Sequence, residues 1–362
     1  MSSPIERRRF NALLAKLSVG AYVATRSKQL FSDEVTQDRL RPNITSGVAS
    51  GDVTQTSATV WSRADRASRM IVELANNESF KNVRRVVGPD AFEHSDYTAK
   101  LRVFGLKPGE PVFYRVCFQD LNESSKTSAP VTGRFTTPST EPRDVQFAWS
   151  GDTVGQGYGI DLARGGMKTF ETIRSLAPDF FVNSGDIIYA DNPLASEMRL
   201  DDGTIWKNII TEGKSKVAES LEEFRSNYRY NLMDANVRRL YAEVPTFVQW
   251  DDHEVLNNWY PTEQLKDDRY SVKSVSFLAA RAKQAFLDYL PIHASNDGMS
   301  RIYRTIPYGP LLEVFFIDLR SYRGVISPNR QTEMNEQSAY MGKQQLQWLK
   351  ANFLLLTNPQ WI

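Results

Sequence analysis

The sequence predicts an all-β sandwich followed by an α/β part in a chain of 362 residues. Short apolar runs separated by turn residues dominate from residue 42 to residue 138, whereas strand-like and helix-like runs alternate after residue 143. A segment rich in proline and threonine, residues 136–142, separates the two patterns. A chain of this length fits about two domains, and its 41% hydrophobic content is enough to form packed cores.

The first pattern is typical of a sandwich of immunoglobulin or fibronectin type. Turn signals separate short strand-like runs, and strands of this length at this spacing are the signature of that architecture. We expect strands at residues 59–61, 70–74, 97–101 and 112–116, with turns at 50–52, 88–90 and 107–109. This part carries no pattern that indicates chemistry.

The second pattern predicts an α/β layered domain, because runs with a period of two alternate along the chain with runs of helical period. The expected strands are residues 145–150, 180–184, 246–250 and 311–318, and the expected helices are 166–176, 217–230, 235–242, 274–289 and 343–354.

The composition excludes several classes of function and of site. The formal net charge is +1 and no basic cluster is interleaved with aromatic residues, so we expect no nucleic acid as a dedicated partner. The single cysteine, Cys117, cannot form an intramolecular disulfide. With only three histidines, a metal site built mainly from imidazoles is excluded, so any metal here would depend on carboxylates and phenolate.

Residues 1–41 predict export. Arg7-Arg8-Arg9-Phe10 precedes a mildly apolar stretch, residues 12–24, which resembles a twin-arginine signal; an amphipathic helix with a basic start is the alternative. Residues 25–42 are polar and predict a linker. No later run reaches the ~18 apolar residues needed to span a bilayer. We therefore expect a secreted or periplasmic protein without a membrane span after the signal.

Three of the expected strands run into acidic residues. They lead to Gly151-Asp152, to Gly185-Asp186 with Tyr189 three residues later, and to Asp251-Asp252-His253-Glu254. Ligands of open α/β sheets bind at the carboxyl ends of strands. Acids that converge there repel one another unless a cation neutralises them. Each motif alone is more typical of a turn, but the three in this order indicate a metal site.

These motifs resemble those of the calcineurin-like metallophosphoesterases, in particular the PhoD-like alkaline phosphatases and the related purple acid phosphatases. The PhoD-like form is most evident at Trp250–Glu254, at Asn257-Asn258-Trp259 and in residues 316–323. Residues 46–52 resemble the start of that family's N-terminal domain. The resemblance covers residues 42–362 and implies a sandwich domain at 42–138 and a metallophosphoesterase domain at 143–362.

The resemblance also implies roles. Asp152 and Tyr189 would bind one metal, Asp186 would bridge two metals, Asp252 would bind the second, and His253 would contact substrate and help the leaving oxygen depart. Anionic oxygen donors suit Fe(III), and a second, divalent ion would be calcium by resemblance. Such a binuclear centre implies hydrolysis of small phosphate monoesters or diesters.

Three further residues are expected to bind substrate: Asn257, Arg320 and Arg323. Arginines can clamp phosphate oxygens, although they can equally pair with nearby acids, and we expect such pairing for at least one of the two.

Two departures from the family pattern qualify this interpretation. Many PhoD-like phosphatases have a cysteine ligand at the first motif, where this chain has Gly151-Asp152. The family's late histidine motifs do not occur before Ile362, and His94 and His293 are not expected to replace them. We therefore expect a C-terminally truncated catalytic domain with incomplete metal sites. An inactive fragment and a secreted binding protein are the alternatives, and the oligomeric state stays open.

Overall fold

A computed structural model describes residues 41–293, 301–328 and 330–356. The signal and linker expected at residues 1–41 lie outside the described residues except for residue 41, and so do the last six residues of the chain. Within them, no helix is long and apolar enough to cross a membrane.

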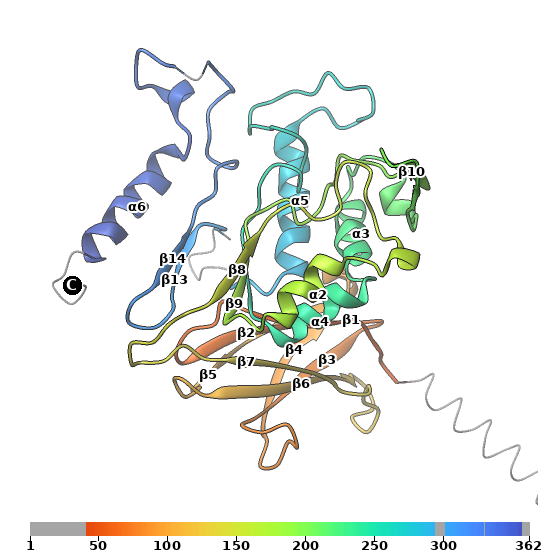
Figure 1. Cartoon of the computed structure of the whole chain (residues 1–362), viewed down its shortest axis with the longest axis vertical. Coiled ribbons are helices and arrows are strands. Elements are labelled where there is room, and N and C mark those ends of the chain that lie inside the picture. Colours follow the sequence, from red (N-terminus) through yellow and green to blue (C-terminus); the bar gives the residue numbers. More distant parts are fainter. Residues whose placement is uncertain (1–40, 294–300, 329, 357–362) are drawn as a thin grey trace, which may run out of the picture.

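The N-terminal part consists of two antiparallel sheets (Figure 1). One has the order β1-β2-β5, formed by β1 (Ile44–Gly51), β2 (Ser57–Ala64) and β5 (Thr98–Phe104). The other has the order β4-β3-β6-β7, formed by β4 (Arg84–Ala91), β3 (Ser68–Ala75), β6 (Pro111–Asp120) and β7 (Val131–Thr136). Inward side chains of both sheets, such as Val60, Val72 and Phe118, share one buried core. The all-β pattern of the sequence is therefore present in the structure.

The turn predicted at residues 88–90 is wrong, because these residues lie inside β4. β4 is an edge strand that pairs only with β3, and the pairing changes register between Arg69 and Ile71, opposite Gly88 and Pro89. A proline, which has no N–H to donate, is tolerated in a strand at an edge or a bulge. The pair Gly88-Pro89 thus marks a β-bulge.

The second part contains a parallel three-stranded sheet with the order β12-β9-β8, made of β8 (Phe147–Ser150), β9 (Phe180–Asn183) and β12 (Thr246–Val248). Its helices are α2 (Lys168–Ser175), α3 (Leu221–Asn231), α4 (Ala235–Glu243), α5 (Val275–Tyr289) and α6 (Gly342–Leu356). Two hairpins complete it, β10 (Glu197–Arg199) with β11 (Ile205–Lys207), and β13 (Arg304–Pro307) with β14 (Glu313–Phe316). Short 3₁₀ turns occur at Glu93–Ser95, Leu162–Arg164, Glu212–Lys214 and Glu336–Ser338.

Successive residues of β9 pack in opposite directions. Phe181 belongs to the core shared with the helices, whereas Phe180 packs against Phe247 and Tyr308 on the side of the β13–β14 hairpin. In Figure 1, α2 to α5 lie on one side of β8 and β9, and the β13–β14 hairpin and α6 lie on the other. Both faces of β9 are therefore covered, which agrees with its unbroken apolar run.

The helix expected at residues 217–230 begins later than predicted, at Leu221. Ser220 accepts a hydrogen bond from the backbone N–H of Glu223, and the Glu223 side chain accepts in return from Ser220. This capping box fixes the start of α3. The hairpin β10–β11 and strand β13 were not expected from the sequence.

The sandwich is fastened to the second part by buried polar contacts. The Asp52 carboxylate, which follows β1, accepts from the Arg304 guanidinium at 2.7 Å and from the backbone N–H of His293 at 2.8 Å. Arg304 also donates to the carbonyl of Val248 at the end of β12. A loop of the sandwich thus supports the strand that leads to Asp252.

Candidate metal centre

The acidic strand ends meet at one edge of the parallel sheet. Because β8, β9 and β12 run in the same direction, the residues that follow them lie at the same edge. Asp152 and Asp186 both adopt left-handed backbone conformations, with φ of 55° and 52°. The backbone N–H of Thr153 donates to the carbonyl of Asp186 at 2.7 Å, which joins the two turns. Left-handed backbone in non-glycine residues costs about 1–3 kcal/mol and is concentrated at functional sites.

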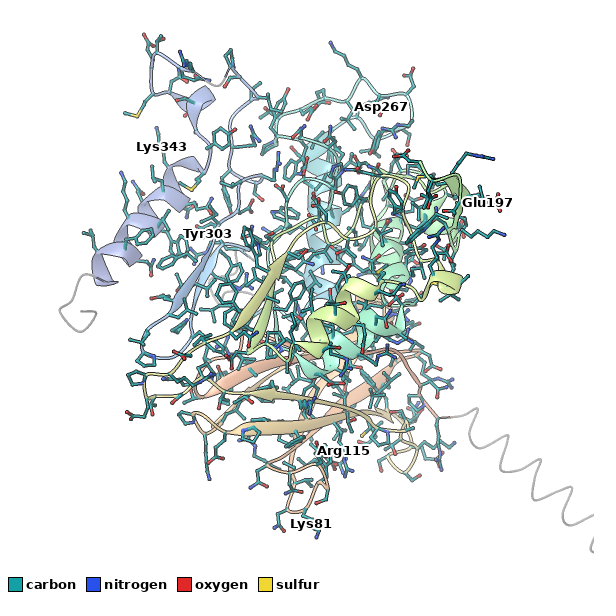
Figure 2. All side chains as sticks on the ribbon, in the orientation of Figure 1. Lys81, Arg115, Glu197, Asp267, Tyr303 and Lys343 are labelled. Carbon is teal, nitrogen blue, oxygen red and sulfur yellow. The ribbon has the colours of Figure 1, made fainter. Side chains whose placement is uncertain are left out.

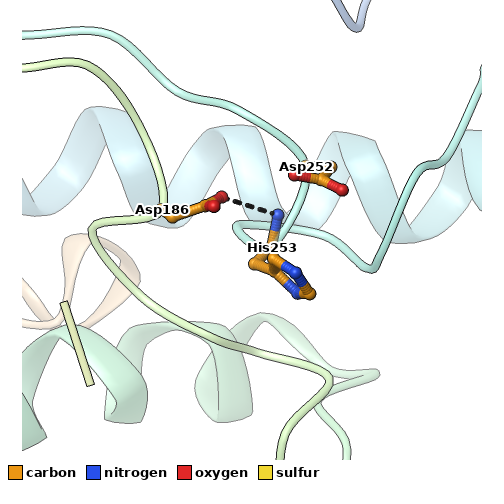
Figure 3. Close-up of side chains that lie close together, drawn as sticks. All are labelled: Asp186, Asp252 and His253. Atoms are coloured by element: carbon orange, nitrogen blue, oxygen red, sulfur yellow. Dashed lines mark hydrogen bonds between the residues drawn. The ribbon is translucent and has the colours of Figure 1, made fainter. Parts of the chain in front are cut away.

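Three side chains form the centre of the site: Asp186, Asp252 and His253 (Figure 3). One ligand atom from each lies within 4.8 Å of the others. Asp186 and Asp252 are buried, and the backbone N–H of His253 donates to Asp186 Oδ1 at 3.1 Å. Two buried carboxylates and an imidazole at this spacing are a donor set that a metal ion can use.

The charges of this group would be stabilised by a bound cation. Burial, and then repulsion by Asp252, raise the pKa of Asp186 well above its usual range. Burial raises the pKa of Tyr189 as well, and the charges of Asp186 and Asp152 add to that shift. Each effect reflects negative groups that face one another in a poorly solvated place. A bound cation would remove this cost, so the residues present fit a metal.

His253 is held by a second acid, Asp191. Its Nδ1 lies 2.7 Å from Asp191 Oδ1, and its ring stacks on the ring of Tyr189 with centroids 4.2 Å apart. Burial by itself would lower the pKa of His253, but the hydrogen bond and the charge of Asp191 outweigh it, so that the pKa is raised. The backbone N–H of Asn257 donates to the other Asp191 oxygen at 2.9 Å. Asp191 therefore fixes the orientation of the imidazole, and Nδ1 is the nitrogen engaged.

Glu254 connects the loops that carry the acids. Its fully buried carboxylate accepts from the backbone N–H groups of Asp186, Ile187 and Asp251 at 3.2, 2.6 and 2.8 Å. Burial, and then the charge of Asp186, raise the pKa of Glu254 to about 8. One side chain thus holds the turn after β9 and the turn after β12 in register.

Lys214 supports the backbone at Tyr189. Its ammonium is buried and donates to the carbonyl of Tyr189 and to Asn227 Oδ1, both at 2.9 Å. No role was expected from the sequence for Asp191, Glu254 or Lys214. Glu254 is the last residue of the third acidic motif, and Asp191 lies two residues after Tyr189, whereas nothing near Lys214 signals its position.

The remaining predicted residues are distributed around this centre. Asp152 is exposed and lies outside the three-residue group, and the side chain of Asn257 is exposed. Arg320 Nε lies 2.6 Å from Asp251 Oδ1, and its NH2 lies 3.5 Å from Asp252 Oδ1. Arg323 stands over the ring of Tyr340, 4.9 Å from its centroid, and lines a separate cavity of about 1000 Å³. The structure brings Arg320 to the acids but not Arg323.

The fold and these acids define a class, namely α/β proteins with a candidate metal site at the carboxyl edge of a parallel sheet. The sequence matches the PhoD-like phosphatase family over residues 147–361 and the N-terminal domain of PhoD-like phosphatases over residues 28–139. The chain belongs to the PhoD-like phosphatase family.

Three individual proteins are similar to this chain. Alkaline phosphatase D of Bacillus subtilis (strain 168) is 25% identical over 374 residues, which cover 97% of this chain and 60% of that protein. A solved structure of PhoD has a TM-score of 0.65 at 24% identity, with 85% of this chain and 59% of that chain covered. The chain thus spans about three-fifths of the length of each relative. A purple acid phosphatase from yellow lupin (Lupinus luteus) gives a TM-score of 0.48 at 14% identity, over 76% of this chain and 44% of that chain.

Proposed function

We propose that this chain is the metal-binding part of a metal-dependent phosphoric-ester hydrolase. The observation that supports this proposal most directly is the group formed by Asp186, Asp252 and His253 at the carboxyl edge of the sheet, in a member of the PhoD-like family. Small phosphate esters are the proposed substrates, whether monoesters or diesters. Support for the activity comes from the relative whose name is alkaline phosphatase D.

Four residues are proposed to hold the metals: Asp152, Asp186, Tyr189 and Asp252. Asp186 would be shared between two ions, which makes the proposed centre binuclear. When bound, the metals would supply Lewis acidity toward the phosphoryl oxygens and lower the pKa of a water. Anionic oxygen donors support Fe(III) as one metal and a divalent ion, calcium, as the other.

The chain's own groups would complete the reaction. His253, with Nδ1 committed to Asp191, can present its other ring nitrogen to the leaving oxygen. Arg320 contributes a fixed positive charge beside Asp252, and one of its nitrogens, NH1, is buried without a hydrogen-bond partner among the described residues. That nitrogen could receive a phosphate oxygen. Asn257 and Arg323 remain proposed substrate contacts, and only the first lies beside the centre.

We further propose the division of the chain into a signal and linker (1–41), a sandwich domain (42–138) and a layered α/β catalytic domain (143–362). Export by the twin-arginine route, to the periplasm or the exterior, is part of the same proposal. It rests on Arg7 and Arg8, which lie outside the described residues.

Metal binding tests the proposed function most directly. The substitutions Asp186→Asn and Asp252→Asn should each weaken metal binding by about 10–100-fold and remove hydrolysis of an aryl phosphate and an aryl phosphodiester. With iron bound, Tyr189→Phe should remove a visible tyrosinate-to-iron absorption band. Asp90→Asn, on the distant edge strand β4, is the control and should change nothing.

Unchanged metal affinity in both aspartate variants would contradict the proposed centre. Tight metal binding without turnover would favour a binding protein or an inactive fragment instead.

A further inference from the structure

A cavity of about 310 Å³ opens beside Asp152, between the end of β8 and the first turns of α2. Its volume is at the lower end of the range for small-molecule sites. Asp152 and Thr153 line one side. Because the backbone N–H of Thr153 donates to the backbone carbonyl of Asp186, this side of the cavity is joined to the turn that carries Asp186. The cavity and the proposed metal centre therefore share the turn at Asp152.

Two aromatic side chains form an outer wall. The rings of Tyr158 and Trp206 meet edge to face, with centroids 5.5 Å apart and an angle of 84° between the planes. Trp206 is fixed by a hydrogen bond from its Nε1 to the carbonyl of Gly159 at 3.1 Å, and the guanidinium of Arg164 stands 5.4 Å from its ring. Tyr158 is 45% exposed, so part of its ring is open to a ligand. Trp206 lies on β11. The other strand of this hairpin, β10, carries Glu197, which is labelled in Figure 2.

The inner surface is apolar. Phe170 and Phe181, whose rings meet edge to face, line it together with Met167 and Ile173. The mouth is polar, since Lys168 and Thr169 on α2 are exposed there. An apolar interior with an aromatic wall and a polar mouth suits a flat, uncharged group attached to a charged one.

We propose that this cavity receives the organic group of the phosphate ester and favours aryl esters over small alkyl esters. The proposal rests on the proposed function, because it needs the phosphoryl group to be held at the acids. Asp152, itself a proposed metal ligand, lines the cavity, so an ester held at the metals would have its organic group near the turn where the cavity begins. A phenyl ring would bury its faces and edges against Tyr158, Trp206 and Phe170. A methyl or ethyl group would leave most of the cavity to water.

The test measures binding of two non-hydrolysable anions, phenylphosphonate and methylphosphonate, to the metal-loaded protein by calorimetry. Thr169→Trp fills the mouth from an exposed position of α2, and Thr172→Trp, exposed on the same helix but outside the cavity lining, is the matched control. We expect Thr169→Trp to weaken phenylphosphonate about tenfold or more, as loss of a buried ring implies, and to leave methylphosphonate within about twofold. Thr172→Trp should change neither. Tyr158→Leu, at the exposed wall, should also lower the preference for the phenyl compound.

Equal affinity of the wild-type protein for both phosphonates would overturn the proposal, and so would equal losses for both in Thr169→Trp. Failure of phenylphosphonate to bind would overturn it as well. A hydrolysis assay separates failure of the proposed function from failure of the cavity proposal. Phenyl selectivity that depends on Thr169, without turnover of phenyl phosphate, would contradict the proposed function and leave the cavity assignment standing. Turnover with equal KM for phenyl and ethyl phosphate would contradict only the cavity.

Discussion

At the scale of single residues, Asp191 and His253 should act as one unit. Each of Asp191→Asn and His253→Asn is expected to lower kcat/KM for an aryl phosphate by about 10²-fold, because the first releases the imidazole and the second removes it. The double variant should be no worse than His253→Asn, since Asp191 contributes only through His253. Steady-state kinetics of the three variants check this.

Asp120→Asn is the control for that cycle, because Asp120 lies at the end of β6 in the sandwich and accepts from the backbone N–H groups of Asn122 and Glu123. Multiplicative losses in the double variant would show that Asp191 acts independently of His253, for example on the substrate or a metal.

The places of single residues in the fold were predictable where their side-chain chemistry and their position in the sequence coincide. Asp186 and Asp252 could be identified because each follows an apolar strand, and parallel strands bring their carboxyl ends together. Asp191 could have been proposed as a site residue because it is an acid two residues after Tyr189. Its contact with the imidazole of His253 could not be predicted, because that contact depends on how the two loops pack. Lys214 could not be found, because a lone lysine in a polar segment is normally exposed.

At the scale of elements, the turns after β9 and β12 are held together by Glu254. Glu254→Gln replaces one acceptor oxygen by an NH₂ group that faces backbone N–H groups. We expect unfolding free energy to fall by about 1–3 kcal/mol and the amides of Asp186, Ile187 and Asp251 to exchange faster with solvent. Urea unfolding and hydrogen exchange measure both effects.

Glu263→Gln, a change in a half-buried acid of the loop before α5, is the matched control and should leave those three amides protected. Unchanged exchange in Glu254→Gln would show that the two turns keep their register without this carboxylate.

The long elements could be predicted well because their periodicity is strong. Short elements and edge strands could not, because they have too few residues or depend on their partners. α5 was expected at 274–289 and is observed at Val275–Tyr289, because fifteen residues give a clear helical period. Gly88-Pro89-Asp90 predicts a turn but lies inside strand β4, since local turn chemistry cannot reveal that a strand lies at an edge. The four-residue strand β13 depends on pairing with β14 and on Arg304, which are non-local interactions.

At the scale of the whole molecule, buried charges join the sandwich to the helices. Asp96 after the first 3₁₀ turn binds Arg63 of the sandwich, Arg229 of α3 and the hydroxyl of Tyr289 of α5. Lys100 of β5 is half-buried at the same junction and donates to the carbonyls of Leu287 and Ile292 at the end of α5. Removing one partner of such a contact leaves the other buried and unsatisfied. The sandwich is thus a structural support of the site, joined to it through α5 and through Arg304.

Lys100 should make this junction sensitive to alkaline pH. Burial lowers the pKa of Lys100 to about 8, although the charges of Asp288 and Asp52 oppose the shift. In the unfolded chain the pKa is about 10.4. Between these values the unfolded chain binds a proton that the folded protein has released, so unfolding free energy rises with pH through this window. Below the folded pKa the cost of the buried ammonium is fully present.

Lys100→Met removes this titration. Relative to the variant, the wild-type protein should gain roughly 1–3 kcal/mol of unfolding free energy between about pH 8 and pH 10.5. The carbonyls of Leu287 and Ile292 lose their donor in the variant, but that cost is independent of pH and does not change the slope. Urea unfolding at pH 7.5, 9 and 10 measures the difference, and Lys107→Met, at a lysine with a 77% exposed side chain, provides the matched control. Equal pH slopes in wild type and Lys100→Met would show that Lys100 keeps an ordinary pKa, and that water or the carboxylates of Asp52 and Asp288 compensate fully for its burial.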